Sequence, residues 1–199
     1  MRFLKFLVRM GSTMRKPVIL VGGTAGTGKS TLARELCSLL SIDHRLGTGF
    51  LREVLRSETS PAKDPDLFTF TFRSENPIKT LIAQARRLQP AILSCIRRAK
   101  NEGTSLVIEG NHLIPELYCD VDVDLYLVLS APPLDEHLRR LQGPSHLKRS
   151  ITAADFKHAV MINEYFRAEA EKLSIPFLLY EDNLMNFAHL ATENVSVGC

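Results

Sequence analysis

Apolar residues follow two different spacings along this chain. Four short segments are apolar at nearly every position and rich in Val, Ile and Leu, which is typical of strands buried on both faces of a sheet. These segments are residues 18–21, 105–108, 123–129 and 176–180. Pro17 precedes the first of them and Gly110 closely follows the second, as expected where strands begin and end.

In the longer segments between these runs, apolar residues recur every three or four positions, which is the period of an amphipathic helix. The predicted helices are residues 29–40, 50–56, 78–100, 134–141 and 152–173. Pro90 should kink the third helix or split it in two, because proline has no N–H for the helical hydrogen bond. Thr152 and Asp155 have the spacing of a capping pair and predict where the last helix starts.

Residues 68–72 alternate strictly between Phe and Thr. This alternation predicts a strand with one buried face, and the alternative interpretation is an aromatic lining of a pocket. Strands that alternate with helices predict an α/β fold, in which a parallel sheet is covered by helices on both faces. We expect a single domain over residues 17–199, preceded by an extension over residues 1–16.

Composition changes this picture little. Hydrophobic residues make up 45% and charged residues 24% of the 199 positions, which is ordinary for a globular protein. No apolar run approaches the roughly 20 residues of a membrane span, so we expect no membrane partner. The net charge of +3 forms no basic block, so we expect no nucleic-acid partner. The four cysteines form no Cys-x-x-Cys motif, which favours reduced thiols and a cytoplasmic location.

The first sixteen residues contain five basic and no acidic residues. They predict either a frayed amphipathic extension or an organelle-targeting peptide, and Met10 and Met14 are alternative starts.

The segment after the first predicted strand has the pattern G-x-x-x-x-G-K-[ST] of a phosphate-binding loop. Its residues are Gly23, Thr24, Ala25, Gly26, Thr27, Gly28, Lys29 and Ser30, followed by Thr31. Glycines let the backbone curl so that its N–H groups point at phosphate oxygens, and the following helix adds its dipole. Lys29 would reach the outer phosphates and Ser30 would bind Mg²⁺. The loop therefore predicts a site for ATP and Mg²⁺.

Other features favour a small kinase among the proteins that carry this loop. The chain has no N-K-x-D motif of GTPases and no L-S-G-G-Q motif of transporters. Glu109 ends an apolar strand, where a carboxylate would hold Mg²⁺ or accept a proton. Arg139 and Arg149 flank a Gly-Pro loop, together with Arg140 and Lys148, and predict a mobile lid at about residues 139–151 that neutralises phosphoryl charge. The expected fold is a three-layer P-loop kinase with a five-stranded sheet.

Three further segments give the chain a resemblance to the 2-phosphoglycerate kinase family. L-G-T-G-F-L-R-E-V-L-R-S, at residues 46–57, is similar to the family's T-D-S-I-R-E-V-M-R, and V-I-E-G-N-H-L-I-P, at residues 107–115, is similar to I-E-G-V-H-L-V-P. Residues 135–139 resemble the helix that leads to the family's lid. The resemblance implies ATP and Mg²⁺, a small phosphorylated or hydroxylated acceptor, and an acceptor site that includes Thr48, Arg52 and His112.

One position departs from the family pattern, because Gly49 stands where the family has Asp. An acidic residue there would suit deprotonation of a hydroxyl. Without it, either Glu109 is the base, or the acceptor oxygen is already ionised, as in a nucleoside monophosphate. The alternatives to a metabolite kinase are therefore a nucleoside monophosphate or nucleoside kinase, and a nucleotide-binding sensor without catalysis. The sequence does not fix the oligomeric state.

Overall fold

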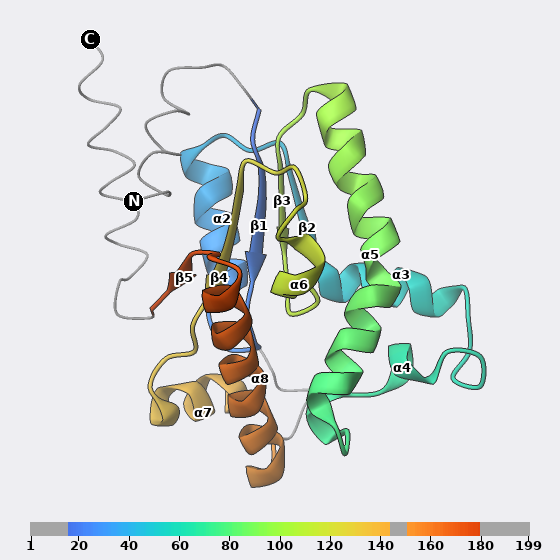
Figure 1. Cartoon of the computed structure of the whole chain (residues 1–199), viewed down its shortest axis with the longest axis vertical. Helices are drawn as coiled ribbons and strands as arrows, with labels where there is room; N and C mark the ends of the chain where they lie inside the picture. The colour runs from blue at the N-terminus through green and yellow to red at the C-terminus, as the bar shows by residue number, and fades with distance from the viewer. Residues whose placement is uncertain (1–15, 144–150, 180–199) are drawn as a thin grey trace.

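Five parallel strands form the centre of the molecule, in the order β2-β3-β1-β4-β5 (Figure 1). Their bounds are β1 Val18–Gly22, β2 His44–Gly47, β3 Leu106–Glu109, β4 Leu125–Leu129 and β5 Phe177–Leu178. This computed structural model describes residues 16–143 and 151–179. The predicted α/β fold with a parallel five-stranded sheet is confirmed.

The helices are α2 Lys29–Leu39, α3 Thr48–Ser57, α4 Pro65–Phe68, the 3₁₀-helix η1 Thr71–Arg73, α5 Pro77–Glu102, α6 Pro115–Tyr118, α7 Leu134–Gln142 and α8 Ala153–Lys172. The five predicted helices are present as α2, α3, α5, α7 and α8, and the short helices α4, η1 and α6 were not predicted. Thr152 and Asp155 form the expected capping box at the start of α8, since each side chain bonds the other residue's backbone N–H.

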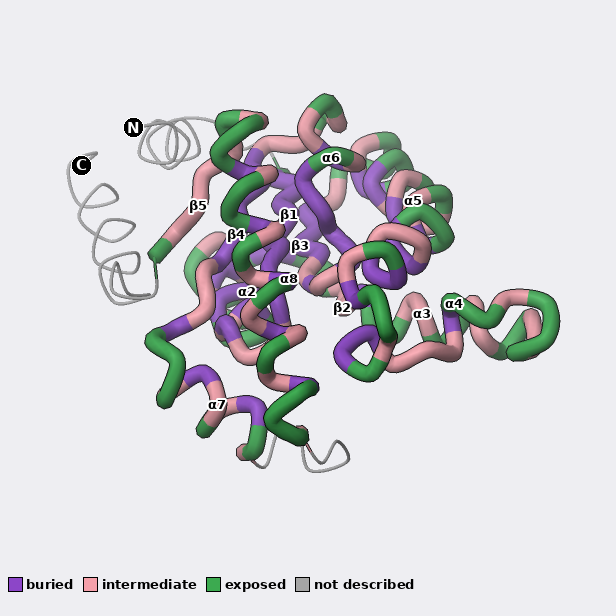
Figure 2. Tube along the Cα trace, turned by 60° about the horizontal axis from the view of Figure 1, so that its bottom comes forward, coloured by how far each residue is buried: buried purple, intermediate pink, exposed green. Residues whose placement is uncertain are grey.

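The sheet has a hydrophobic core on each face, which makes the molecule three layers thick. Alternate residues of β1 point to opposite faces: Ile19 and Val21 pack with α2, while Val18 and Leu20 pack with α5 and α8. The strands β1 and β4 are buried along their length, as is β3 up to the partly buried Glu109, and exposed residues lie on the outer sides of the helices (Figure 2).

One predicted strand is absent, and one strand of the sheet was not predicted. Residues 68–72 form no strand: they join the end of α4 to η1, where Phe72 and Thr71 are buried in the core. The alternating Phe and Thr therefore reflect a compact turn of chain that packs aromatic rings inward. The fifth strand is β2, which has exposed residues at His44 and Arg45 because it lies at the edge of the sheet. Its polar pattern gave no apolar run to recognise.

Pro90 does not split its helix, because α5 continues unbroken from Pro77 to Glu102 with Pro90 inside it. Apolar residues on both sides of Pro90, such as Leu88 and Ile92, are fully buried against the sheet. This packing on both halves compensates for the hydrogen bond that proline cannot make.

Part of the predicted lid lies outside the described residues, including Lys148 and Arg149, and so does the N-terminal extension up to residue 15. Within residues 16–143 and 151–179, no helix combines the length and apolar content needed to cross a bilayer.

Parallel strands bring their carboxyl ends to one edge of the sheet, where loops can gather functional side chains. The loops that follow β1, β2 and β3 all begin at this edge. Helices α3 and α4 lie to one side of it and α7 lies to the other (Figure 1). The candidate site is built between them.

Candidate active site

The phosphate-binding loop after β1 has the backbone shape that its glycines permit. Gly23, Gly26 and Gly28 have φ values of +129°, +80° and +95°, in the region that favours glycine. At Gly23 a side chain would also collide with the backbone of Leu129, since a Cβ would lie 2.5 Å from the Leu129 carbonyl oxygen. Helix α2 then starts at Lys29, so its N-terminus faces the loop.

Lys29 lies inside the loop and is 8% exposed. Its Nζ donates to the backbone carbonyl of Thr24 and, at 3.4 Å, to Thr27 Oγ1. Burial lowers the pKa of the Lys29 ammonium to about 8, and the negative charge of Glu109 partly opposes this shift. The loop therefore holds a cation with little water around it, close to where phosphates would lie.

Glu109, at the end of β3, lies against the start of α2. Its Oε1 accepts a hydrogen bond of 2.8 Å from Ser30 Oγ. Two hard oxygen donors side by side suit Mg²⁺, which takes a few protein oxygens and completes its shell with phosphates and water. Across residues 16–143 and 151–179, no group of three or more His, Cys, Asp or Glu could form a protein-only metal cage. The Ser30–Glu109 pair therefore fits a metal that arrives with nucleotide phosphates.

Helix α7 supports the loop from the opposite side. His137, buried at 1% exposure, donates through Nε2 to the Ala25 carbonyl at 2.8 Å. A side chain at Gly26 would meet the His137 ring at 3.0 Å, so the loop and the ring are in close contact. The burial of His137 lowers its pKa, so a neutral imidazole supports the loop. No motif in the sequence marked His137 as part of the site.

The two neighbouring arginines of α7 both bond Glu136, but they differ in exposure and in contact with the loop. Arg139 is 73% exposed and pairs with Glu136 at 2.6 Å. Arg140 also bonds Glu136, but its NH1 reaches the Gly26 carbonyl at 3.5 Å, and it is only 28% exposed. Arg140, rather than the predicted Arg139, thus lies against the phosphate-binding loop. Arg149 lies outside the described residues.

The predicted acceptor residues Thr48 and His112 lie together. Thr48 is the first residue of α3, and its Oγ1 is 2.9 Å from His112 Nδ1. Both side chains are almost fully buried, at 1% and 2% exposure, so in this arrangement they support the site from beneath its surface. Burial, reinforced by the positive charges of Arg52 and Lys29, lowers the pKa of His112 to about 3. The imidazole is therefore neutral at physiological pH.

Gly110 makes room for this contact. A Cβ on Gly110 would lie 1.8 Å from Thr48 Oγ1, closer than any two atoms can pack without a bond. The E-G-x-H segment therefore has a residue without a side chain between its carboxylate and its histidine, because α3 lies directly over that residue.

Arg52, one turn further along α3, faces the segment between α4 and η1. Its Nε donates to the Leu67 carbonyl at 2.7 Å, and its NH2 donates to the Thr69 carbonyl at 2.9 Å. The positive charges of Arg52 and Lys29 add to the effect of burial in lowering the pKa of His112. Glu109 bonds Ser30 of the loop and Gly110 packs against Thr48, so the loop and the residues predicted for the acceptor are neighbours.

A buried glutamine that the sequence analysis missed connects these residues. Gln84 of α5 is fully buried, and its Oε1 is 3.1 Å from both His112 Nε2 and Thr71 Oγ1. The signal in the sequence was its place on the apolar stripe of α5, between Leu81 and Leu88.

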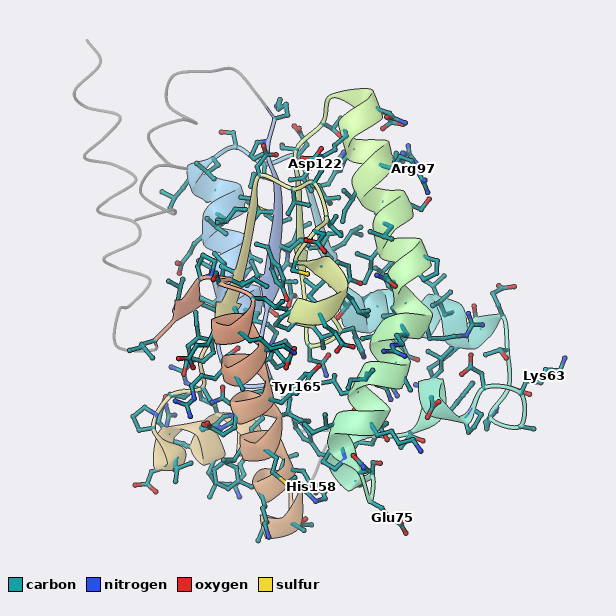
Figure 3. The ribbon with its side chains drawn as sticks, viewed as in Figure 1. Lys63, Glu75, Arg97, Asp122, His158 and Tyr165 are labelled. Carbon is teal, nitrogen blue, oxygen red and sulfur yellow. The ribbon has the colours of Figure 1, made fainter. Side chains whose placement is uncertain are left out.

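Helix α8 contacts both halves of the site. Thr24 Oγ1 of the loop donates to the Ala159 carbonyl at 3.4 Å, and the His158 ring bonds the Phe72 carbonyl of η1 at 2.6 Å. His158 lies near the start of α8 (Figure 3). The start of α8 thus contacts both the phosphate-binding loop and η1, which follows the segment that Arg52 bonds.

Comparison with known proteins adds a family match to this geometry. A profile of the AAA_18 family, described as an AAA domain, matches residues 19–167. A 2-phosphoglycerate kinase from Methanocaldococcus jannaschii is 31% identical over 189 residues, covering 86% of this chain and 61% of that protein. One from Pyrococcus furiosus is 27% identical over 176 residues, covering 81% and 58%.

The chain therefore spans about 60% of the length of these relatives. The resemblance to 2-phosphoglycerate kinases that the sequence indicated is confirmed.

Solved structures support the fold. A shikimate kinase from Acinetobacter baumannii, in complex with shikimate, superposes with a TM-score of 0.56 at 15% identity and covers 92% of each chain. A deoxyadenosine kinase from M. mycoides superposes with a TM-score of 0.55 at 15% identity, covering 90% of this chain and 99% of that one. At this identity the likeness is one of fold.

Proposed function

This chain belongs to the AAA_18 family of AAA domains, and from that premise we propose a function for it. The protein transfers the γ-phosphoryl group of ATP to a small anionic metabolite. The acceptor that we propose is 2-phosphoglycerate, phosphorylated on its free hydroxyl. The names of the most similar relatives favour this acceptor. The observation that carries the proposal is the Ser30–Glu109 hydrogen bond beside a buried Lys29 in a phosphate-binding loop.

In the proposed reaction, the loop backbone and Lys29 hold the β- and γ-phosphates. The acceptor hydroxyl attacks the γ-phosphorus, a new P–O bond forms, and the bond from this phosphorus to the bridging oxygen breaks, so that ADP leaves. The hydroxyl proton passes to the carboxylate of Glu109. Catalysis here is positioning and charge stabilisation, with no covalent intermediate on the protein.

Ser30 and one carboxylate oxygen of Glu109 would hold Mg²⁺, which neutralises phosphate charge when it is bound, and the other oxygen would take the proton. Arg140 lies against the loop and would add positive charge near the transferred group. On the acceptor side, Arg52 provides a guanidinium suited to a carboxylate or phosphate, and 2-phosphoglycerate carries one of each. The hydrogen bond between Thr48 and His112 holds the start of α3, the helix that carries Arg52.

Gly49 favours a second candidate function. It is exposed, with open space where a side chain would lie, so the site has no carboxylate at this position to take a proton. A nucleoside monophosphate, whose acceptor oxygen is already ionised, needs no such group. The alternative is therefore a nucleoside monophosphate or nucleoside kinase, and the further one is a nucleotide-binding sensor that does not turn over.

An ADP-release assay with a panel of acceptors tests the proposal. The panel contains 2-phosphoglycerate, 3-phosphoglycerate, nucleosides, nucleoside monophosphates and no acceptor. We expect ADP release to depend on 2-phosphoglycerate and to disappear in Lys29→Ala. Turnover only with a nucleoside or nucleoside monophosphate would overturn the proposed acceptor, and tight ATP binding without turnover on any acceptor would favour the sensor.

A further inference from the structure

The proposed function does not by itself explain why α5 carries a glutamine on its buried face. Gln84 has no exposed surface and lies on the stripe that contains Leu81, Ala85 and Leu88, all of them fully buried. A buried amide is costly unless each of its hydrogen-bonding positions has a partner. A leucine would fill this position at no such cost, so the glutamine calls for a specific reason.

Each of these positions on Gln84 is used. Its Nε2 donates to the Asp66 carbonyl at 2.7 Å and to the Thr69 carbonyl at 2.8 Å. Its Oε1 lies 3.1 Å from both Thr71 Oγ1 and His112 Nε2. Because backbone carbonyls only accept hydrogen bonds, the end of the amide that faces them must be the NH₂ group, and the oxygen must face the ring.

The orientation of the amide dictates the protonation of the ring. An amide oxygen only accepts hydrogen bonds, so His112 Nε2 must carry the proton. The neutral ring then has a bare Nδ1, which accepts a hydrogen bond from the Thr48 hydroxyl at 2.9 Å. The result is a directional chain from Thr48 through His112 to Gln84, and it fixes the first residue of α3.

Gln84 acts on Arg52 by a second route. The Thr69 carbonyl accepts from both Gln84 Nε2 and Arg52 NH2, at 2.8 Å and 2.9 Å. The segment that contains this carbonyl is held by Gln84 at Asp66, Thr69 and Thr71. Gln84 therefore helps to hold the backbone carbonyls on which the Arg52 guanidinium rests.

We propose that Gln84 is a positioning residue for the acceptor. It fixes the tautomer of His112 and the backbone carbonyl that binds Arg52. In this way it holds α3 in one arrangement over the site. This inference rests on the proposed function for its kinetic consequence, while its structural consequence stands alone. Its effect should fall on the acceptor, because none of its partners belongs to the phosphate-binding loop.

The direct test is the tautomer of His112, read from the imidazole ¹⁵N shifts in long-range ¹H–¹⁵N spectra at pH 7. The His112→Asn spectrum assigns the signals among the six histidines. We expect a protonated Nε2 and a bare Nδ1 in the wild type. In Gln84→Met, which has similar length but no amide, the Nδ1–H tautomer should appear, because its hydrogen bond to Thr48 then becomes the better one. A wild-type ring protonated on Nδ1, or an unchanged ring in Gln84→Met, would overturn the inference.

Steady-state kinetics test the consequence for the site. Gln84→Met should raise the KM for the acceptor by about tenfold or more and leave the KM for ATP within about twofold, since a small displacement of a positioning group is enough. Gln89→Met is the matched control, because Gln89 lies on the same helix and makes one hydrogen bond to the Leu117 carbonyl, at 3.0 Å. It should leave both the acceptor KM and the His112 spectrum unchanged. Equal rises of the two KM values in Gln84→Met would contradict the inference.

A second variant covers the case in which Gln84→Met does not fold. Gln84→Glu keeps the shape of the side chain and replaces the NH₂ donor, so it should change both the acceptor KM and the His112 nitrogen shifts. No change in either would count against the inference. If the wild type phosphorylates no acceptor in the panel, the proposed function fails, while the wild-type and variant spectra still decide the role of Gln84.

Discussion

Among single residues, Lys29 gives the site a dependence on pH. Its pKa is lowered to about 8 by burial, so the ammonium loses its proton as the pH rises through about 8. Bound phosphates should raise this pKa again, because they favour the charged form. ATP binding at pH 8.5 should therefore take up a fraction of a proton, equal to the share of Lys29 that is neutral there.

Calorimetry in buffers of different ionisation enthalpy measures this uptake. In Lys29→Arg the uptake should vanish even where ATP still binds, because arginine stays charged at this pH. Equal uptake by the wild type and Lys29→Arg would show that another group titrates.

The two arginines of α7 offer a matched pair. Arg140 reaches the Gly26 carbonyl, whereas Arg139 is mostly exposed. We expect Arg140→Ala to lower kcat by about 100-fold, as for loss of a charge that stabilises the transferred group. Arg139→Ala should change it by less than about threefold. Steady-state rates at saturating ATP decide between them, and the reverse order would restore the assignment to Arg139.

The role of Gly49 can be tested by adding a side chain rather than by removing one. Nothing lies within 4 Å of where its Cβ would be, so Gly49→Asp fits without a clash. A carboxylate at this position, where the 2-phosphoglycerate kinase pattern has Asp, should raise kcat on a hydroxyl acceptor by about tenfold. Gly49→Ala, which adds a Cβ without the acid, is the control for helix stability. A lower kcat in Gly49→Asp than in Gly49→Ala would argue against a role for a base at this position.

At the level of elements, Pro90 destabilises α5, and a single substitution should remove this effect. Pro90 lies inside this helix, is exposed, and cannot donate to the Arg86 carbonyl. Pro90→Ala should raise the free energy of unfolding by about 1–3 kcal/mol, measured by urea denaturation. Pro65→Ala is the control, because Pro65 is exposed at the first position of α4, where no helical bond is missing. Equal effects of the two substitutions would contradict this explanation.

Elements with a strong local signal were predicted from the sequence, and those defined by tertiary contacts were not. The apolar runs predicted β1, β3 and β4 and the glycine pattern predicted the loop, because those signals lie within a few residues. Strand β2 was missed because an edge strand needs no apolar run. Arg139 and Arg140 differ by one position, and only the packing of α7 decides which of them faces the loop.

The buried network illustrates the same limit. Thr48, Gln84 and His112 come from three segments separated by 28 to 64 residues. The family resemblance placed His112 and Thr48 in one expected acceptor site. It did not indicate that the two would be bonded to each other and buried, because that depends on how α3 and α5 pack over the end of β3.

On the scale of the whole molecule, the strand order places the phosphate-binding loop next to the residues that we propose for the acceptor. Strand β3 lies between β1 and β2, so Glu109 is in register with Val21 before the loop and with Gly47 before α3. The charges of Lys29 and Arg52 both act on His112, which lies just beyond Glu109. An anionic acceptor that enters there would be attracted by both cations while it approaches the γ-phosphate.

The most direct test of this account is ³¹P NMR of a reaction of the protein with ATP, Mg²⁺ and 2-phosphoglycerate. We expect the γ-phosphate signal of ATP to decrease as a second phosphate ester appears on the acceptor, one for one, with Glu109→Gln and Lys29→Ala inactive. Release of inorganic phosphate without a new ester, or a phosphate trapped on a protein side chain, would contradict direct transfer between the two halves of the site.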